Sequence, residues 1–178
     1  ISHVYSADGS KLRTVWVADG DTLTTDYCGN VIYENGVPVR LMTDVGYIAL
    51  SDTSYHYFIK DHQGNVRVVA DEHGNAEEVN DYYAFGGLMS TSSRQSVQPY
   101  KYNGKELDSK GGLDWYDYGA RMYDAALGRF MKTDRFSEKY VSLSPYQYGA
   151  NNPVNNIDVN GDSIWYTRNG DIVTMHVT

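Results

Sequence analysis

Tight-turn signals recur along the first half of the chain, and they separate short runs in which apolar and polar residues alternate. Asn35-Gly36 lies between two such runs, and the segments Asp61–Asn65 and Asp71–Asn75 supply two further turns. Asn-Gly and Asp-Gly pairs accept the positive φ angles that hairpin loops require, and the alternation has the period of a strand. The pattern predicts hairpins with strands at about residues 3–7, 11–18, 22–27, 30–34, 37–43, 46–50, 54–61, 65–71 and 76–83.

The aromatic residues are mostly tyrosine, with 17 Tyr against 4 Phe and 3 Trp in 178 residues. Tyrosine suits half-buried strand positions, and its hydroxyl needs a partner when it is covered. The chain also has 17 Gly and only 4 Pro, which favours many short strands joined by glycine turns. No segment has a convincing helical period, and we expect at most one or two helical turns, at Ser144–Gly149. The predicted fold class is all-β.

The net charge of -8 disfavours nucleic acid and anionic membranes as partners, because binding to phosphates depends on Lys and Arg. A single cysteine, Cys28, allows no intramolecular disulfide. No apolar run approaches the ~20 residues of a membrane helix, and residues 1–20 lack the order of a signal peptide. The chain starts with residues typical of a strand, so we expect it to be cut from a longer protein.

Several segments resemble the Rhs (rearrangement hotspot) family of YD-repeat proteins. The tyrosine and Asp-Gly hairpins of residues 1–86 are similar to degenerate YD repeats, and Tyr82–Gly86 resembles the segment that precedes the family's core. Tyr102–Asp108 resembles its next motif. The strongest likeness lies in Trp115–Asp134 and continues through Ser144–Gly161, which together resemble the Rhs repeat-associated core.

The resemblance implies a strip of β-hairpins that curls into part of a shell or barrel, with residues 1–98 as degenerate repeats and residues 99–162 as the core. Residues 163–178 would begin a C-terminal extension. The implied function is structural: the core closes a shell that scaffolds or encapsulates a variable C-terminal effector domain. Its partners would be that domain and the upstream repeats. The implied setting is a bacterial protein that is secreted or lies on the cell surface.

The same resemblance implies an alternative function, an aspartyl autoprotease that acts once and releases the C-terminal domain. Asp134, Asp158 and Arg121 match the positions of the family's functional residues, and the cut would fall near Asp162–Ser163. Two carboxyl groups held close together do not both ionise readily, so one can act as an acid while the other activates water. A guanidinium could stabilise the oxyanion.

Three residues depart from the family's pattern at this candidate site. Arg135 and Val159 stand where the family often has proline, and Asp162 stands where leucine closes the cleavage motif. Proline fixes φ and would prepare the turn that is cut, so these departures favour a degenerate protease. A structural alternative is that Arg121 is a buried cation that ties aspartates together, while Asp134 and Asp158 cap turns.

Tyr116, Tyr118 and Tyr123 have two interpretations. Alternate tyrosines on a strand fill one face of a core, but an exposed set could stack on sugars in a cell-surface adhesion or glycan-binding module. The histidines have no metal-ligand spacing and no calcium loop is present, so the sequence predicts no metal and no cofactor.

Overall fold

The computed structural model describes residues 1–18, 20–93, 97–162, 164–168 and 171–174. The chain divides into two compact units. The first unit contains Ile1–Lys60 and Arg67–Val79, and the second contains Asp61–Val66 and Asn80–Thr178. The described residues form antiparallel strands and short 3-10 turns, so the predicted all-β class is confirmed. No helix among them is long and apolar enough to cross a membrane.

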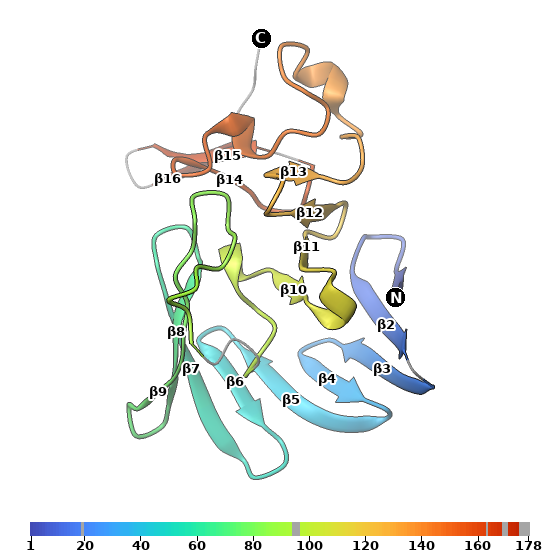
Figure 1. The fold of residues 1–178 in the computed structure, drawn as a ribbon, viewed down its shortest axis with the longest axis vertical. Coiled ribbons are helices and arrows are strands. Elements are labelled where there is room, and N and C mark those ends of the chain that lie inside the picture. Colours follow the sequence, from blue (N-terminus) through green and yellow to red (C-terminus); the bar gives the residue numbers. More distant parts are fainter. Residues whose placement is uncertain (19, 94–96, 163, 169–170, 175–178) are drawn as a thin grey trace. The chain divides into compact units, whose positions relative to one another are not determined.

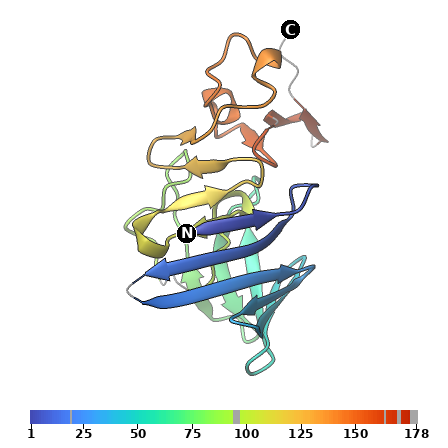
Figure 2. The same cartoon turned by 90° about the vertical axis from the view of Figure 1, so that its right-hand side faces the viewer.

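The first unit is built on a nine-stranded antiparallel sheet in which each strand pairs with its neighbours in sequence (Figure 1). Figure 2 shows its first strands, in blue, lying side by side. The strands are β1 (Ser2–Tyr5), β2 (Lys11–Ala18), β3 (Asp21–Cys28), β4 (Val31–Glu34), β5 (Val37–Thr43), β6 (Gly46–Ala49), β7 (Ser54–Lys60), β8 (Val66–Asp71) and β9 (Ala76–Val79).

All nine predicted strands of this sheet are present, with bounds within a few residues of those predicted. The ninth is shorter than predicted and ends at Val79. It ends there because Asn80 turns its side-chain amide onto the Val66 carbonyl, and Tyr82 forms a separate bridge with Leu88. Between β4 and β5, Asn35 and Gly36 both have positive φ, as the two-residue hairpin loop requires.

One five-residue turn recurs in both units. Its first residue donates its N–H to the carbonyl of the fifth, and its fourth residue, always glycine, donates back to the carbonyl of the first. The turn occurs at 6–10, 61–65, 71–75, 83–87 and 101–105. In the two Asp-x-x-Gly-Asn copies the aspartate side chain also accepts from the third and fifth backbone N–H groups. The predicted turns at 61–65 and 71–75 are therefore two copies of one structural motif, which differs from the two-residue loop at Asn35-Gly36.

The second unit contains two small antiparallel sheets. The first has the order β10 (Glu106–Asp108), β11 (Trp115–Asp117), β12 (Met122–Asp124) and β13 (Arg129–Phe130). The second consists of β14 (Asn156–Asp158), β15 (Ile164–Arg168) and β16 (Asp171–Thr174). Near the C-terminus, β15 and β16 pair as an antiparallel hairpin. Its turn residues, Asn169 and Gly170, lie outside the described residues.

The described part of the second unit has four 3-10 turns, at Tyr102–Gly104, Lys110–Gly112, Ser137–Lys139 and Gly149–Asn151, where the sequence predicts one or two helical turns at most. Their predicted place, Ser144–Gly149, is wrong. Ser144 opens a β-turn instead, because the Gln147 N–H donates to its carbonyl at 3.0 Å. Tyr148 then takes an extended conformation with its ring buried, which prevents a helix from continuing through it.

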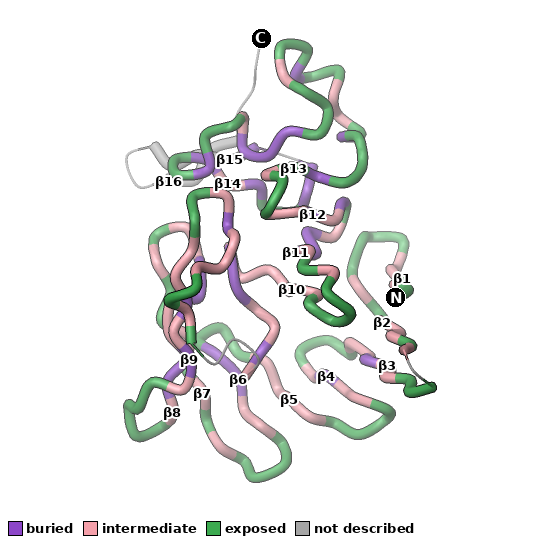
Figure 3. The backbone as a smooth tube through the Cα atoms, viewed as in Figure 1, coloured by how far each residue is buried: buried purple, intermediate pink, exposed green. Residues whose placement is uncertain are grey.

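The main hydrophobic core lies in the second unit and is built from aromatic rings. Figure 3 marks the buried positions of the chain in purple. One face of the β10–β13 sheet supplies a row of paired residues: Leu107, Tyr116, Tyr123 and Phe130. Tyr102, Tyr118 and Tyr148 complete the buried set, which we call the tyrosine core. Ring centroids within it lie 4.5 to 6.4 Å apart, mostly tilted or edge-on, the range in which aromatic pairs attract.

Candidate functional site

The buried tyrosines use their hydroxyls to hold the turn that follows Tyr82. Three phenols donate to three successive backbone carbonyls: Tyr102 to Ala84 at 3.0 Å, Tyr123 to Phe85 at 2.7 Å, and Tyr116 to Gly86 at 2.9 Å. Gly86 is required here, because an added Cβ would lie 2.5 Å from the Tyr102 ring. This explains the glycine that ends the Tyr82–Gly86 motif.

Two further phenols converge on Asn103, whose backbone is left-handed. Tyr118 donates to the Asn103 side-chain oxygen at 2.7 Å, and Tyr148 donates to the same atom. The Asn103 side-chain amide in turn donates to the Gln63 carbonyl at 3.1 Å. Every buried phenol of the tyrosine core thus has an acceptor, as burial of a polar group demands.

Burial raises the pKa of each tyrosine in this core, to about 12 for Tyr102. Tyr116, Tyr118 and Tyr123 are at most 2% exposed. The alternative of a sugar-stacking platform made from these three residues is therefore wrong, because no ligand can reach their faces. Their role is core packing.

Arg121 stands at the turn between β11 and β12, where its carbonyl accepts from the Tyr118 N–H at 3.1 Å. Its guanidinium lies 3.8 Å from the centroid of the Phe130 ring, and the residue is 4% exposed. Burial lowers the pKa of Arg121, and the neighbouring carboxylates act in the opposite direction. A buried arginine of this kind needs anionic partners.

Asp134 and Asp158 are those partners, and both approach the same guanidinium nitrogen. Arg121 Nη2 lies 2.9 Å from Asp134 Oδ2 and 3.6 Å from Asp158 Oδ2. The two aspartates are 5% and 1% exposed. The structure thus brings together all three residues that the sequence analysis named, and we call them the acid cluster. Whether they catalyse a reaction stays a prediction.

The second carboxylate oxygen of each aspartate caps a turn. Asp134 Oδ1 accepts from the Phe136 N–H at 2.7 Å. Asp158 Oδ1 accepts from Asn160, Gly161 and Asp162, the Gly161 bond being the shortest at 2.6 Å. Both parts of the structural alternative therefore describe this site. One oxygen of each aspartate caps a turn, and the other oxygen lies near the Arg121 guanidinium.

The segment after Asp158 is held at three successive carbonyls. Lys105 Nζ donates to Val159, the Ala120 N–H donates to Asn160 at 3.1 Å, and Arg121 Nε donates to Gly161. Asp162, which is 2% exposed, then pairs through its carboxylate with Arg135. The segment 158–162 is consequently fixed against the acid cluster. Ser163, on the far side of the expected cut, lies outside the described residues.

The pair of Arg135 and Asp162 is the part of the site that the sequence analysis missed. The sequence analysis names Arg135 as a departure from the family's pattern, and Asp162 as a departure and as one side of the expected cut, but it does not pair them. A cation that departs from the family's pattern at position 135, together with an acid that departs from it at position 162, indicates that the two side chains could form an ion pair. Lys105 was also missed, because its partner is a backbone carbonyl that has no signature in sequence.

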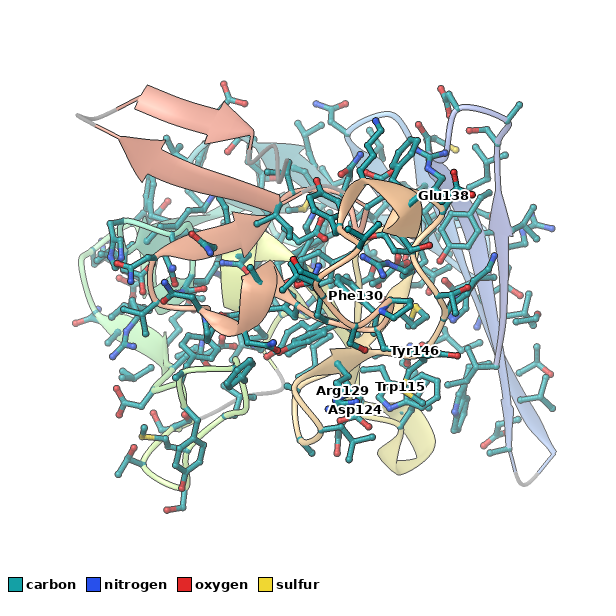
Figure 4. The ribbon with its side chains drawn as sticks, turned by 90° about the horizontal axis from the view of Figure 1, so that it is seen from above. Trp115, Asp124, Arg129, Phe130, Glu138 and Tyr146 are labelled. Carbon is teal, nitrogen blue, oxygen red and sulfur yellow. The ribbon has the colours of Figure 1, made fainter. Side chains whose placement is uncertain are left out.

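The opposite face of the β10–β13 sheet is polar and lies outside the acid cluster. Trp115, Asp124 and Arg129 are cross-strand neighbours there, and Figure 4 shows them grouped near Tyr146. Trp115 Nε1 donates to Asp124 Oδ2 at 3.2 Å. Asp124 also caps a turn with Oδ1, from Ala126 at 2.8 Å. It therefore resembles Asp158 in its turn but has a different partner for its other oxygen.

Comparison with known proteins identifies the family. The family model of the teneurin YD-shell matches residues 44–154, more than half of the 178 residues. The chain belongs to this YD-shell family, among the Rhs-type YD-repeat proteins.

Salivary gland surface protein 1 of Aedes aegypti is 35% identical over 112 residues, which are 62% of this YD-shell chain and 3% of that protein. The tRNA nuclease WapA of Bacillus subtilis (strain 168) is 27% identical over 94% of the chain and 8% of its own length.

Solved structures share the YD-shell fold. The crystal structure of TcdB2-TccC3-Cdc42 has a TM-score of 0.72 and 20% identity, and the match covers 89% of this chain and 9% of that one. The Photorhabdus luminescens Tc holotoxin pore has a TM-score of 0.71 and 20% identity, over 88% of this chain and 8% of that one. This YD-shell chain therefore spans less than a tenth of the length of these relatives.

Proposed function

We propose that the chain closes a YD-repeat shell that scaffolds or encapsulates a variable C-terminal effector domain in a secreted or cell-surface protein. In this proposal residues 1–98 are degenerate repeats, residues 99–162 are the closing core, and residues 163–178 begin an extension toward the effector. The upstream repeats and the effector domain are the partners.

The observation that carries this proposal is the nine-stranded sheet of the first unit. It pairs each strand only with its neighbours in sequence, so β1 and β9 are edge strands. Edge strands expose unpaired backbone groups, and a repeat protein satisfies them by adding further repeats. The matched segments are only 3% and 9% of the lengths of two YD-shell relatives, which is consistent with such additions.

Protease protection tests the encapsulation. The full-length product of the gene that encodes this chain would be digested beside its isolated C-terminal domain. We expect the domain to resist digestion in the intact protein and to become sensitive once denaturant opens the shell. Equal digestion rates of the intact and isolated forms, with the shell folded, would contradict the proposal.

The acid cluster favours a second candidate function, a single self-cleavage near the end of the core. Asp134 and Asp158 are buried on one guanidinium, and this setting suits one carboxyl as the base for water and the other as the acid. Mass spectrometry of the purified chain tests it. Self-cleavage predicts two fragments in the unchanged protein and one intact chain in Asp158→Asn. An intact mass for both proteins would reject it.

A further inference from the structure

The second unit contains a mostly apolar groove with a volume of about 980 Å³. Of the described residues that line it, none belongs to the acid cluster. The lining consists of residues 83–88, Leu107, Tyr116 and residues 125–126, with Ser109 and Asp114 as its polar non-aromatic members. Phe85, Leu107 and Ala125 also pack against the tyrosine core. Mostly apolar pockets of ~300–1,000 Å³ are the usual binding sites for small ligands.

The turn at residues 83–87 gives this groove a fixed floor. Its carbonyls at Ala84, Phe85 and Gly86 accept from three buried phenols. The Tyr83 N–H donates to the Gly87 carbonyl at 2.8 Å, and the Gly86 N–H donates to the Tyr83 carbonyl at 2.8 Å. A fixed floor reduces the entropy that is lost on binding. Because these backbone groups already have partners, the groove favours a ligand that has no peptide backbone to satisfy.

Asp114 supplies the only carboxylate among the described residues of the lining, which include no lysine, arginine or histidine. Asp114 is exposed, and its carboxylate makes no hydrogen bond or ion pair with the described residues. Its backbone is left-handed, with φ of +52°, a conformation that aspartate and asparagine adopt more readily than most residues. One anionic group on an otherwise apolar surface is complementary to a ligand with one positive charge.

We propose that this groove binds a small apolar amine, that is, an alkyl- or arylammonium ion. The ammonium group pairs with the Asp114 carboxylate, and the Ser109 hydroxyl offers a second acceptor. The hydrocarbon part of the ligand covers Phe85 and Leu107, which removes apolar surface from water. This binding function goes beyond shell closure and self-cleavage, since neither of those functions uses the groove.

A nuclear magnetic resonance titration of the isotope-labelled 178-residue chain tests the inference. The probes are phenethylammonium, phenethyl alcohol and hydrocinnamate, which share a phenyl ring and differ in charge. We expect phenethylammonium to shift the backbone amide signals of Gly86, Gly87 and Ala126 until they saturate. The alcohol should bind about fivefold more weakly, the upper range for an exposed ion pair, and hydrocinnamate should bind weakest. Methylammonium, which has the charge without the ring, should not saturate these signals.

Three variants locate the binding site. Asp114→Asn keeps the shape of the side chain and suits the left-handed backbone, so it should fold normally and bind phenethylammonium about fivefold more weakly. Glu138→Gln is the matched control, because Glu138 is an exposed acid of the same unit that does not line the groove. It should bind like the unchanged chain. Ala126→Phe fills the groove from an exposed position and should abolish binding of the amine and the alcohol.

Three results would overturn the inference. If a folded chain shows no saturable shift of the groove amides, the groove binds no amine of this class. If the ammonium ion and the alcohol bind equally, or if Asp114→Asn and Glu138→Gln weaken binding equally, Asp114 does not select the ligand, and the net charge of -8 attracts cations without a specific site. If an apolar peptide that contains lysine binds more tightly than phenethylammonium, the occupant of the groove is a peptide and not a small amine.

Discussion

Two segments of the second unit each have three successive carbonyls held in place, but by chemically different groups. At Ala84–Gly86 the donors are neutral phenols of the tyrosine core. At Val159–Gly161 they are a lysine, a backbone N–H and an arginine, beside three buried aspartates. Neutral donors can fix a turn but offer no charge to a reaction. Charged donors can fix a turn and also offer charge to a reaction, but a buried charged donor needs partners of opposite charge.

The difference matters for what each segment can tolerate. Removing one phenol hydroxyl leaves one carbonyl without its donor, which costs about 1–3 kcal/mol. Removing one charged group of the acid cluster leaves buried opposite charges without compensation, which costs more. The tyrosine core should therefore be robust to single changes in its hydrogen bonds, while the acid cluster should behave as one cooperative group.

The largest expected effect tests that cooperativity. Arg121→Met fills similar space but removes the cation from two aspartates that are at most 5% exposed. We expect a loss of about 3–5 kcal/mol in the free energy of unfolding, measured by urea denaturation. Arg121→Lys, which keeps the charge but not the planar fork, should lose less. Equal losses for the two variants would show that charge compensation is not what Arg121 provides.

The second-largest expected effect tests the close contact between Gly86 and the Tyr102 ring. In Gly86→Ala the new Cβ meets the Tyr102 ring at 2.5 Å, in a backbone with φ of +88°. Overpacking and a left-handed alanine together should cost about 3 kcal/mol. Gly87→Ala is the matched control, because its Cβ meets the Tyr83 ring at an ordinary 3.7 Å. Similar melting temperatures for the two variants would contradict the packing given for Gly86.

A third test uses pH to distinguish the segment held by neutral phenols, Ala84–Gly86, from the segment held by charged groups, Val159–Gly161. Burial raises the pKa of Tyr102 to about 12, against 10.0 for an ordinary phenol. The folded state therefore holds this proton more tightly than the unfolded state. Its stabilising effect is complete below pH 10 and is lost as pH rises toward 12, by about 3 kcal/mol for this one group.

Alkaline denaturation measures that loss. Urea denaturation at stepped pH should show stability falling steeply above pH 10, and Tyr102→Phe should make the fall shallower. Tyr55→Phe, at an exposed tyrosine of the first unit, should leave the slope unchanged. A slope that Tyr102→Phe does not alter would mean that this phenol is not protonated and buried as described.

The elements that could be predicted from sequence depend on neighbours in the chain. The strands and glycine turns of the first unit follow from alternation and Asn-Gly or Asp-Gly pairs, which act within a few residues. The misplaced helix at Ser144–Gly149 has the same origin, because Ser followed by Pro opens a turn as readily as a helix. Burial of Tyr148, a tertiary effect, decided between them.

The candidate site shows where local reasoning ends. Arg121, Asp134 and Asp158 could be named because they match a family's motif. Which of their oxygen and nitrogen atoms bonds to which partner could not be predicted. The acceptors of the phenols are backbone carbonyls, which every residue has, so no sequence pattern marks Ala84 as the partner of Tyr102. Such pairings depend on how distant strands pack.

The smallest expected effect concerns the ion pair between Arg135 and Asp162, two residues that depart from the family's pattern. Arg135 is largely exposed, with 66% of its side chain accessible, but its partner Asp162 is only 2% accessible. We expect Arg135→Gln to lower the free energy of unfolding by about 1 kcal/mol, near the upper limit for surface pairs, because a buried carboxylate loses its cation. Arg13→Gln is the control, since the Asp26 partner of Arg13 is 23% accessible and should lose less. If Arg135→Gln has no effect in low salt, the Asp162 carboxylate is compensated by other groups, and the role given to this ion pair is wrong.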